Sequence, residues 1–277
     1  MAELPSFKAR PEWVGPVLAL FREHAGHYSA LEEAIAHWWQ NQSARTRPPH
    51  VRNSLRAVFG PTLRHLSLIT GAGENITVTH QGDRLLTAQA GGEAQFKKQF
   101  AAHVTRLDHE SWIRVLPYLN TAQTPPTLSQ LVEHIRESYP SIPHIDTQKL
   151  TKYLNYFAFT GLVQFSGPYV NLRIKQYEAA RTGAWTPLPP PARFVHAVER
   201  AYDRLSAGNI YVPIPLLRDA VCRELGIWDD EFDTMLLEMP KETHSHIVQL
   251  SAPMARARGG LRIGGAYVYY IAVHRKA

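Results

Sequence analysis

The sequence predicts a mostly helical α+β protein in which one pattern, three helices followed by a β-hairpin, occurs three times in tandem. Apolar residues recur at helical spacing, and in each third of the chain two short apolar runs follow the last helix. The runs LVQF and IVQL are near-copies at the same place in the second and third patterns. The units are expected over residues 1–92, 93–182 (with a bridging helix) and 193–277, and a proline-rich extended linker over 183–192.

The first unit opens with two amphipathic patterns, one expected to be helical beyond Pro16 and one that Ser29 is placed to cap. The third pattern, PPHVRNSLRAVFG, has proline at its start and glycine at its end, which is typical of a helix. HLSLIT and ITVTH flank the turn GAGEN and predict a hairpin, and GDRLL predicts a short closing helix. The predicted helices cover 17–24, 29–42, 48–60 and 82–86.

The second unit is expected to start with the bridging helix, over 93–107, because four apolar residues there share one face. Further helices are predicted over 108–119, where Pro117 is unfavourable, and over 127–138, where Thr127 is placed as the cap.

The third helix of this unit begins at Asp146 or Thr147 and ends at Gly161. Its apolar residues fall at i, i+3, i+4 and i+7, which predicts one buried face. LVQF and YVNLRI then flank SGP, a turn signal, and predict a hairpin. Every charge between Asp146 and Glu178 is positive.

The third unit repeats the order less regularly. Helices are predicted in ARFVHAVERAYDRLSAG, PIPLLRDAVCRELG and DDEFDTMLLEMP, with a short strand at IYV. HIVQL and AYVYYIAV predict two strands joined by a long basic loop.

The composition is that of an ordinary globular protein, with 277 residues, 44% hydrophobic and a net charge of +6. No apolar run approaches the length of a membrane span, and the first residues lack the apolar core of a secretory signal. Cys222 is the single cysteine, so no internal disulfide can form, and we expect it to be buried rather than reactive. These features predict a cytoplasmic protein without a membrane contact.

Three helices followed by a two-stranded hairpin resemble the winged-helix family, a helix-turn-helix variant found in prokaryotic regulators and DNA-recognition subunits. The resemblance covers nearly the whole chain as three tandem copies and rests on topology, not on a signature motif. It implies that each third helix enters the major groove of double-stranded DNA and that each hairpin, the wing, contacts the backbone or the minor groove.

The charge pattern of the first two units favours this interpretation, since acid is missing from their third helices. Arginine and asparagine suit guanine and adenine edges, although a solvated basic helix face would look similar. The candidate DNA-binding residues come from the third helices, the second wing and the acid-free segment just before the first of these helices. They are Arg45, Arg47, His50, Arg52, Asn53, Arg56, Gln148, Lys149, Thr151, Lys152, Asn155, Arg173 and Lys175.

The third unit departs from that pattern because its third helix is acidic and its wing is basic. We expect the helix to bind a protein partner through Asp229, Asp230, Glu231 and Asp233. We expect the wing to contact DNA through Arg256, Arg258 and Arg262.

The sequence contains no phosphate-binding glycine loop, no nucleophile elbow and no convincing set of metal ligands. We therefore expect a non-enzymatic DNA-binding protein without metal or cofactor, either a transcription regulator or a DNA-recognition subunit. The alternative is a scaffold or adaptor subunit of a larger prokaryotic DNA-repair, chromosome-maintenance or phage-defence complex, binding mainly protein. The acidic helix of the third unit favours that alternative.

Overall fold

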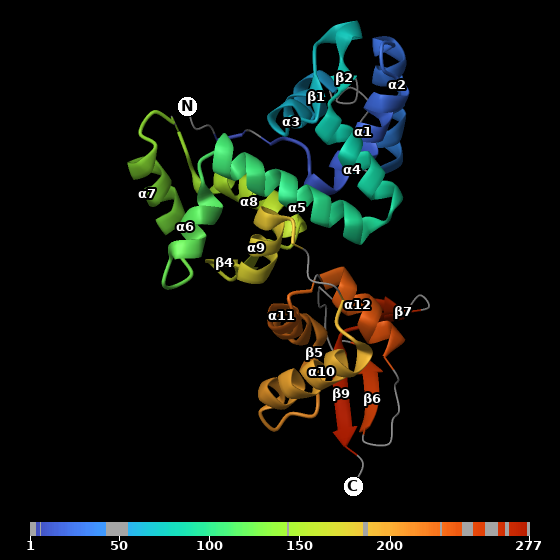
Figure 1. The fold of residues 1–277 in the computed structure, drawn as a ribbon, viewed down its shortest axis with the longest axis vertical. Coiled ribbons are helices and arrows are strands. Elements are labelled where there is room, and N and C mark those ends of the chain that lie inside the picture. Colours follow the sequence, from blue (N-terminus) through green and yellow to red (C-terminus); the bar gives the residue numbers. More distant parts are fainter. Residues whose placement is uncertain are drawn as a thin grey trace. The chain divides into compact units, whose positions relative to one another are not determined.

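The structure, a computed structural model, describes residues 4–5, 7–42, 55–142, 144–184, 188–227, 229–239, 246–252, 260–263 and 266–275. The described part is mostly helical with small antiparallel sheets, so the α+β prediction is confirmed (Figure 1). The chain forms two compact units, Met1–Ala184 and Trp185–Ala277, which are called the first unit and the second unit from here on. The predicted linker contains their boundary, and the predicted division at residue 92 lies inside the first.

The first unit begins with helices whose order follows the prediction. Its elements are α1 (Val14–Glu23), α2 (Tyr28–Gln42), the π-helical turn η3 (Leu55–Phe59), α3 (Gly60–His65), β1 (Ile69–Thr70), β2 (Thr77–Val78) and α4 (His80–Ala90). The prediction that Gly60 ends the third helix is wrong, because α3 starts there and runs on to His65. Glycine is needed at this junction, since a Cβ would lie 2.8 Å from the Leu55 carbonyl oxygen, and Pro61 is tolerated in the first turn.

The bridging helix α5 (Glu93–Glu110) is longer than predicted, and the prediction of a single helix over 108–119 is wrong. The chain leaves the helix after Glu110, and Arg114 takes a left-handed conformation (φ 53°) before α6 (Val115–Thr121) begins. Pro117 lies in the first turn of α6, where a backbone N–H would have no carbonyl partner within the helix, so the missing N–H of proline costs no hydrogen bond. The proline therefore marks a helix start, not a flaw late in a helix.

The rest of the first unit matches the predicted order and adds one helix. It comprises α7 (Leu128–Ser138), α8 (Thr147–Phe159), β3 (Val163–Ser166), β4 (Tyr169–Leu172) and the unpredicted α9 (Ile174–Thr182). The Thr127 side chain caps α7 in a capping box with Gln130, as sequence predicted for the cap. Gly161 takes a positive φ of 73° just after α8, which is where glycine is favoured.

Strands β3 and β4 pair antiparallel in the register Val163↔Leu172. A third extended segment joins them, because Thr127 forms a bridge with Tyr169 on the free side of β4. The order across this small sheet is therefore Thr127, β4, β3.

The core of the first unit is rich in aromatic rings gathered where α5 and α8 meet the N-terminal segment. The Phe7 ring lies 3.9 Å from that of Tyr156 and meets that of Trp112 edge-on at 5.5 Å. The Tyr156 hydroxyl donates to the Ala9 carbonyl (2.9 Å), so the N-terminal segment is fastened to α8.

The second unit packs helices α10, α11 and α12 with a three-stranded antiparallel sheet. Its elements are α10 (Pro191–Ser206), β5 (Val212–Pro213), α11 (Ile214–Leu225), α12 (Asp229–Glu238), β6 (His246–Ser251), β7 (Leu261–Ile263), β8 (Ala266–Val268) and β9 (Tyr270–Arg275). The sheet order is β5-β9-β6, and β7 and β8 form a separate small hairpin within the β6–β9 connection. The predicted strand over 266–273 is thus divided at Tyr269.

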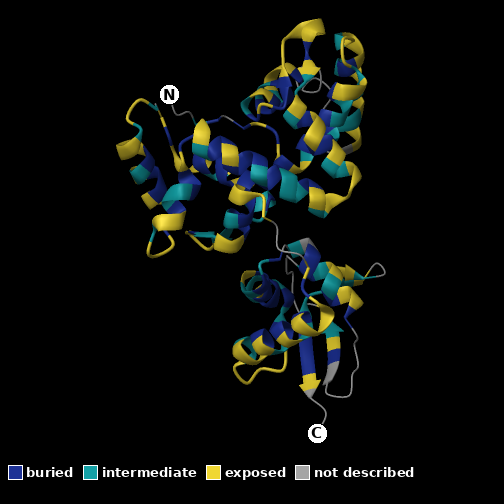
Figure 2. Cartoon of the chain, in the orientation of Figure 1, coloured by how far each residue is buried: buried dark blue, intermediate teal, exposed yellow. Residues whose placement is uncertain are grey.

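The core of the second unit lies between these helices and the sheet. Figure 2 shows β9 buried along much of its length and α10 buried along one side. Cys222 is fully buried in this core, among Phe194, Leu217 and Phe232. Its burial agrees with the structural role expected from the sequence.

Candidate nucleic-acid interface

Helix α8 is held by a cap at its start and by an apolar face along its length. The Asp146 carboxylate accepts a hydrogen bond from the Lys149 backbone N–H (2.7 Å). Leu150, Leu154 and Phe157 are fully buried. Because these positions share one side of the helix, the opposite side faces outward.

The outward side, called here the α8 outer face, carries residues that the sequence predicted to contact DNA. Four are exposed and Thr151 is half-buried. Among the described residues, no side-chain hydrogen bond engages Gln148, Lys152 or Asn155, so their amide and ammonium groups can meet an external partner. The α8 outer face consists of Gln148, Lys149, Thr151, Lys152 and Asn155.

The other two residues of the α8 outer face have internal bonds. The Thr151 hydroxyl donates to the Thr147 carbonyl (2.7 Å), and Lys149 Nζ donates to the His144 carbonyl (2.6 Å). The Lys149 ammonium keeps two further N–H donors. No carboxylate occurs between Thr147 and Phe159, so the helix offers mainly donors and positive charge.

The hairpin beside α8 does not project as a basic wing. The Pro168 carbonyl at its turn accepts the Leu128 N–H (3.1 Å), and the Val170 N–H donates to the Pro126 carbonyl (2.9 Å), so the tip is tied to the preceding segment. The placement predicted for Arg173 is wrong, because that residue is 5% exposed and lies at the N-cap of α9.

Lys175 is exposed, as expected, but it belongs to the first turn of α9 and not to the hairpin. The period-two pattern of YVNLRI concealed this change, since Ile174 already begins the helix. Nothing in the hairpin strands themselves therefore carries positive charge.

Most candidates of the first third lie outside the described residues. Arg56 is described and exposed; its Nε donates to the Tyr28 hydroxyl (3.0 Å) and lies 3.5 Å from a Glu32 carboxylate oxygen. The Tyr28 hydrogen bond and the Glu32 charge raise the pKa of the Arg56 guanidinium. Arg56 thus has neighbours within its own chain, which the sequence pattern did not indicate. The candidates outside the described part are Arg45, Arg47, His50, Arg52 and Asn53.

The acidic residues of α12 do not form the exposed partner surface that the sequence predicted. Glu231 is 8% exposed. Asp233 forms a two-pronged ion pair with the Arg218 guanidinium of α11 (2.7 and 3.0 Å). Asp229 is half-buried, and the side chain of Asp230 lies outside the described part. Glu231 is therefore not an exposed carboxylate, and Asp233 is engaged by Arg218 of α11.

Of the three arginines predicted on the last wing, one can be placed. Arg262 is exposed on β7. Arg256 and Arg258 lie outside the described residues.

A buried carboxylate that positions α8 was missed by the sequence analysis. Asp108, at 0% exposure, accepts hydrogen bonds from the Tyr153 hydroxyl and from the Val115 and Leu116 N–H groups (3.1 and 2.9 Å). Burial raises the pKa of Asp108 to about 6, although the Tyr153 and backbone hydrogen bonds act to lower it. The sequence signal that could have indicated this residue is an aspartate that lies seven residues before a helix with a proline in its first turn.

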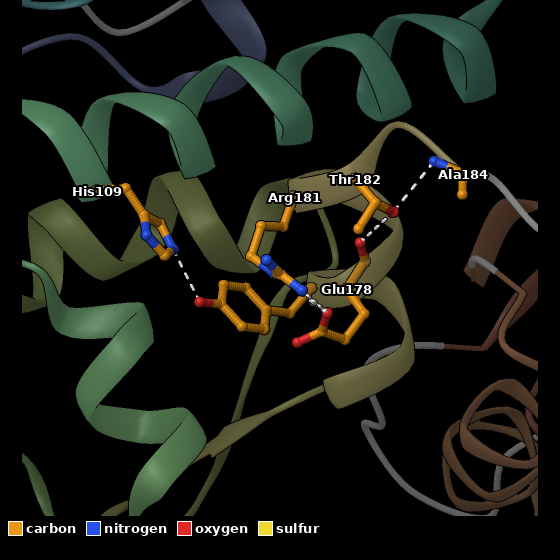
Figure 3. Close-up of polar contacts among 6 residues, drawn as sticks. His109, Glu178, Arg181, Thr182 and Ala184 are labelled. Carbon is orange, nitrogen blue, oxygen red and sulfur yellow. Dashed lines mark hydrogen bonds and ion pairs between the residues drawn. The ribbon is translucent and has the colours of Figure 1, made fainter.

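The end of α5 is also joined to α9. The Nε2 atom of His109 lies 2.7 Å from the Tyr177 hydroxyl, a contact drawn as a dashed line in Figure 3. The two rings are nearly parallel, with 5.8 Å between their centroids. On the same helix Arg181 donates to the Glu178 carboxylate, and the Thr182 hydroxyl accepts the Ala184 N–H (3.2 Å). The contact between His109 and Tyr177 therefore joins α9 to the end of α5, whereas the other two contacts are local to α9 and the residues that follow it.

The described residues contain no group of three or more His, Cys, Asp or Glu side chains placed to hold a metal ion. None of the described helices combines the length and apolarity needed to cross a membrane. Comparison with protein-family models, with curated proteins and with solved structures finds no match for this chain.

Proposed function

We propose that this chain is a non-enzymatic, cytoplasmic protein that binds double-stranded DNA with the α8 outer face. The observation that carries the proposal is the exposure of Gln148, Lys152 and Asn155 on one side of a helix without acid. A lysine ammonium suits a phosphate, and the side-chain amides of glutamine and asparagine suit base edges in a groove.

The topology around α8 supports a winged-helix interpretation. Helices α7 and α8 are followed by the β3–β4 hairpin, and Thr127 adds the third extended segment beside β4. The second unit has the same order, with α11 and α12 followed by β6 and β9, and with β5 in the place of Thr127. This order supports α8 as the proposed reading helix. The first third, with its two-residue strands, is proposed as a reduced third copy.

The test is binding of a fluorescently labelled duplex, followed by anisotropy at increasing salt. We expect affinity to fall steeply with salt, because each phosphate contact releases a condensed counterion. Lys152→Ala should weaken binding, while Arg193→Ala, which removes an exposed charge from α10, should leave it unchanged. An affinity that does not change with salt would contradict the docking of α8 on DNA. Equal affinities for Lys152→Ala and the unaltered protein would contradict it as well.

A second candidate function is a scaffold or adaptor subunit that binds protein through the second unit. Its support is no longer the acid of α12 but one exposed apolar side chain on that helix, Leu237, which is 43% exposed. A small and mainly apolar hollow lies beside it, lined by Pro191, Phe194, Val195, Met235, Glu238 and Met239. Exposed apolar groups of this kind favour protein contacts over phosphate contacts. Duplex binding by the isolated protein at moderate salt would contradict this alternative as the main function.

A further inference from the structure

A hollow of about 570 Å³ opens on the first unit between α3, the turn after it, and the end of α5. Leu107 and Trp112 form its floor, and both are buried. Four polar side chains form most of its rim. They are Arg64, His65, Ser67 and Ser111.

The rim offers hydrogen-bond donors and positive charge. Arg64 is always protonated, and His65 and the two serines add an imidazole ring and hydroxyl groups to the rim. No described residue of the lining carries a carboxylate. The acidic residue next to Ser111 in sequence, Glu110, is paired with Arg106 (2.7 Å). This set of groups suits an anion with several acceptor oxygens.

Two residues of the rim are fixed by hydrogen bonds and have further N–H or O–H donors besides those that form these bonds. Arg64 Nε donates to the Gly71 carbonyl (3.2 Å), and the guanidinium has four more N–H groups. Ser67 has a left-handed backbone (φ 54°), which is rare for serine. Its N–H donates to the Arg64 carbonyl (2.8 Å), and its carbonyl accepts the Thr79 hydroxyl (2.8 Å). The bond from Ser67 to Arg64, together with the Leu68 N–H donating to the Leu63 carbonyl (2.9 Å), forms the C-terminal cap of α3, so the backbone at Ser67 is fixed beside the hollow.

The segment between His65 and Ser67 is anchored from inside the core. His103, on α5, contacts the Leu66 carbonyl through Nε2 (2.5 Å), and burial lowers the pKa of His103 to about 4. At neutral pH the ring is therefore uncharged and donates its Nε2–H to that carbonyl. The hollow is thus built on a fixed backbone.

We propose that this hollow binds the phosphate group of a nucleotide. Arg64 supplies the positive charge, the side chains of His65, Ser67 and Ser111 line the site with hydrogen-bonding groups, and the apolar floor accommodates the organic part. The phosphate belongs either to a free nucleotide or to a DNA strand; only the second source depends on the proposed function, since no residue of the α8 outer face lines the hollow.

The first arm of the test is calorimetric titration with adenosine 5′-monophosphate, with adenosine as the phosphate-free control. If the source is a free nucleotide, the monophosphate binds in a saturable, salt-sensitive manner and adenosine does not. Arg64→Ala weakens binding about tenfold and Ser111→Ala about threefold, because one charged and one neutral donor are lost. Arg193→Ala, in the other unit, leaves binding unchanged. Thermal unfolding of each variant shows whether it folds. If Arg64→Ala does not fold, Ser111→Ala still tests the proposal.

The second arm uses duplex DNA with the same variants. If the monophosphate does not bind but Arg64→Ala and Ser111→Ala weaken duplex binding, the source is a DNA phosphate. A failure of the proposed function gives a different result. In that case Lys152→Ala does not change the affinity for duplex DNA, while the protein still binds the monophosphate. The proposal is overturned if neither ligand distinguishes Arg64→Ala and Ser111→Ala from Arg193→Ala.

Discussion

The Tyr153 hydroxyl donates a hydrogen bond to the buried carboxylate of Asp108, which also accepts two N–H groups at the start of α6. One carboxylate thereby joins α5, α6 and α8. Because α8 presents the proposed DNA-binding face, this contact links the stability of the core to the position of the site.

The Asp108 carboxyl should make stability depend on pH between about 4 and 6. Its pKa is raised from 3.8 to about 6 in the folded protein, so in this interval the folded state holds a proton that the unfolded chain has lost. The contribution of Asp108 to the free energy of unfolding is therefore greatest below its unfolded pKa. It falls by about 3 kcal/mol in total as the pH rises through its folded pKa. Urea unfolding of the unaltered protein and Asp108→Asn, at several pH values, measures the difference.

Tyr153→Phe provides the control for this assignment. It removes a hydrogen bond that lowers the pKa of Asp108 in the folded protein, so the upper end of the pH-dependent interval should rise while its lower end stays. Stability curves for Asp108→Asn that run parallel to those of the unaltered protein would show that Asp108 does not titrate there.

Tyr177→Phe should loosen α9 without disturbing α5. The variant keeps the ring that stacks on His109 but removes the hydroxyl 2.7 Å from Nε2. We expect a loss of about 1 kcal/mol, the usual value for one hydrogen bond. Hydrogen exchange should accelerate in 174–182 and remain slow in 96–107. Unchanged exchange in α9 would mean that the contact does not hold this helix.

Asp233→Ala should destabilise the second unit by about 2–4 kcal/mol, because the Arg218 side chain, only 11% exposed, loses its two-pronged partner. The matched control is Arg223→Ala, which breaks an ion pair within α11 whose arginine is 54% exposed. We expect about 0.5 kcal/mol or less for the control. Thermal unfolding measures both, and equal effects would contradict an internal role for Asp233.

Two substitutions on the α8 outer face should have different effects on DNA binding. Lys152→Ala should weaken binding to all duplexes alike and reduce the salt dependence, as expected for a phosphate contact. Asn155→Ala should reduce discrimination between duplexes by about 1–3 kcal/mol, as expected for a base contact. Selection from a random duplex library, followed by anisotropy on selected and scrambled sites, separates the two. Identical selectivity in both variants would remove Asn155 from base recognition.

The apolar spacing of the sequence was sufficient to predict α5, α7 and α8, together with the caps Thr127 and Asp146. These features are local, since a helix face and its cap are set by residues within a few positions of one another. The same spacing predicted a helix over 108–119 wrongly, because the break at Arg114 depends on Asp108 binding the start of α6. That contact involves a buried side chain that periodicity does not identify.

The sequence by itself determined the mostly helical α+β class and the outward side of α8. Only the tertiary structure decided the fate of individual charges: it buried Arg173 before α9, engaged Asp233 with Arg218, and gathered Arg64, His65, Ser67 and Ser111 around one hollow. The physical reason is that periodicity fixes which side of a helix is apolar, whereas an ion's partner comes from another element. Charge along the chain therefore indicated a basic segment, but the packing of neighbouring helices determined which charges remain available to a ligand.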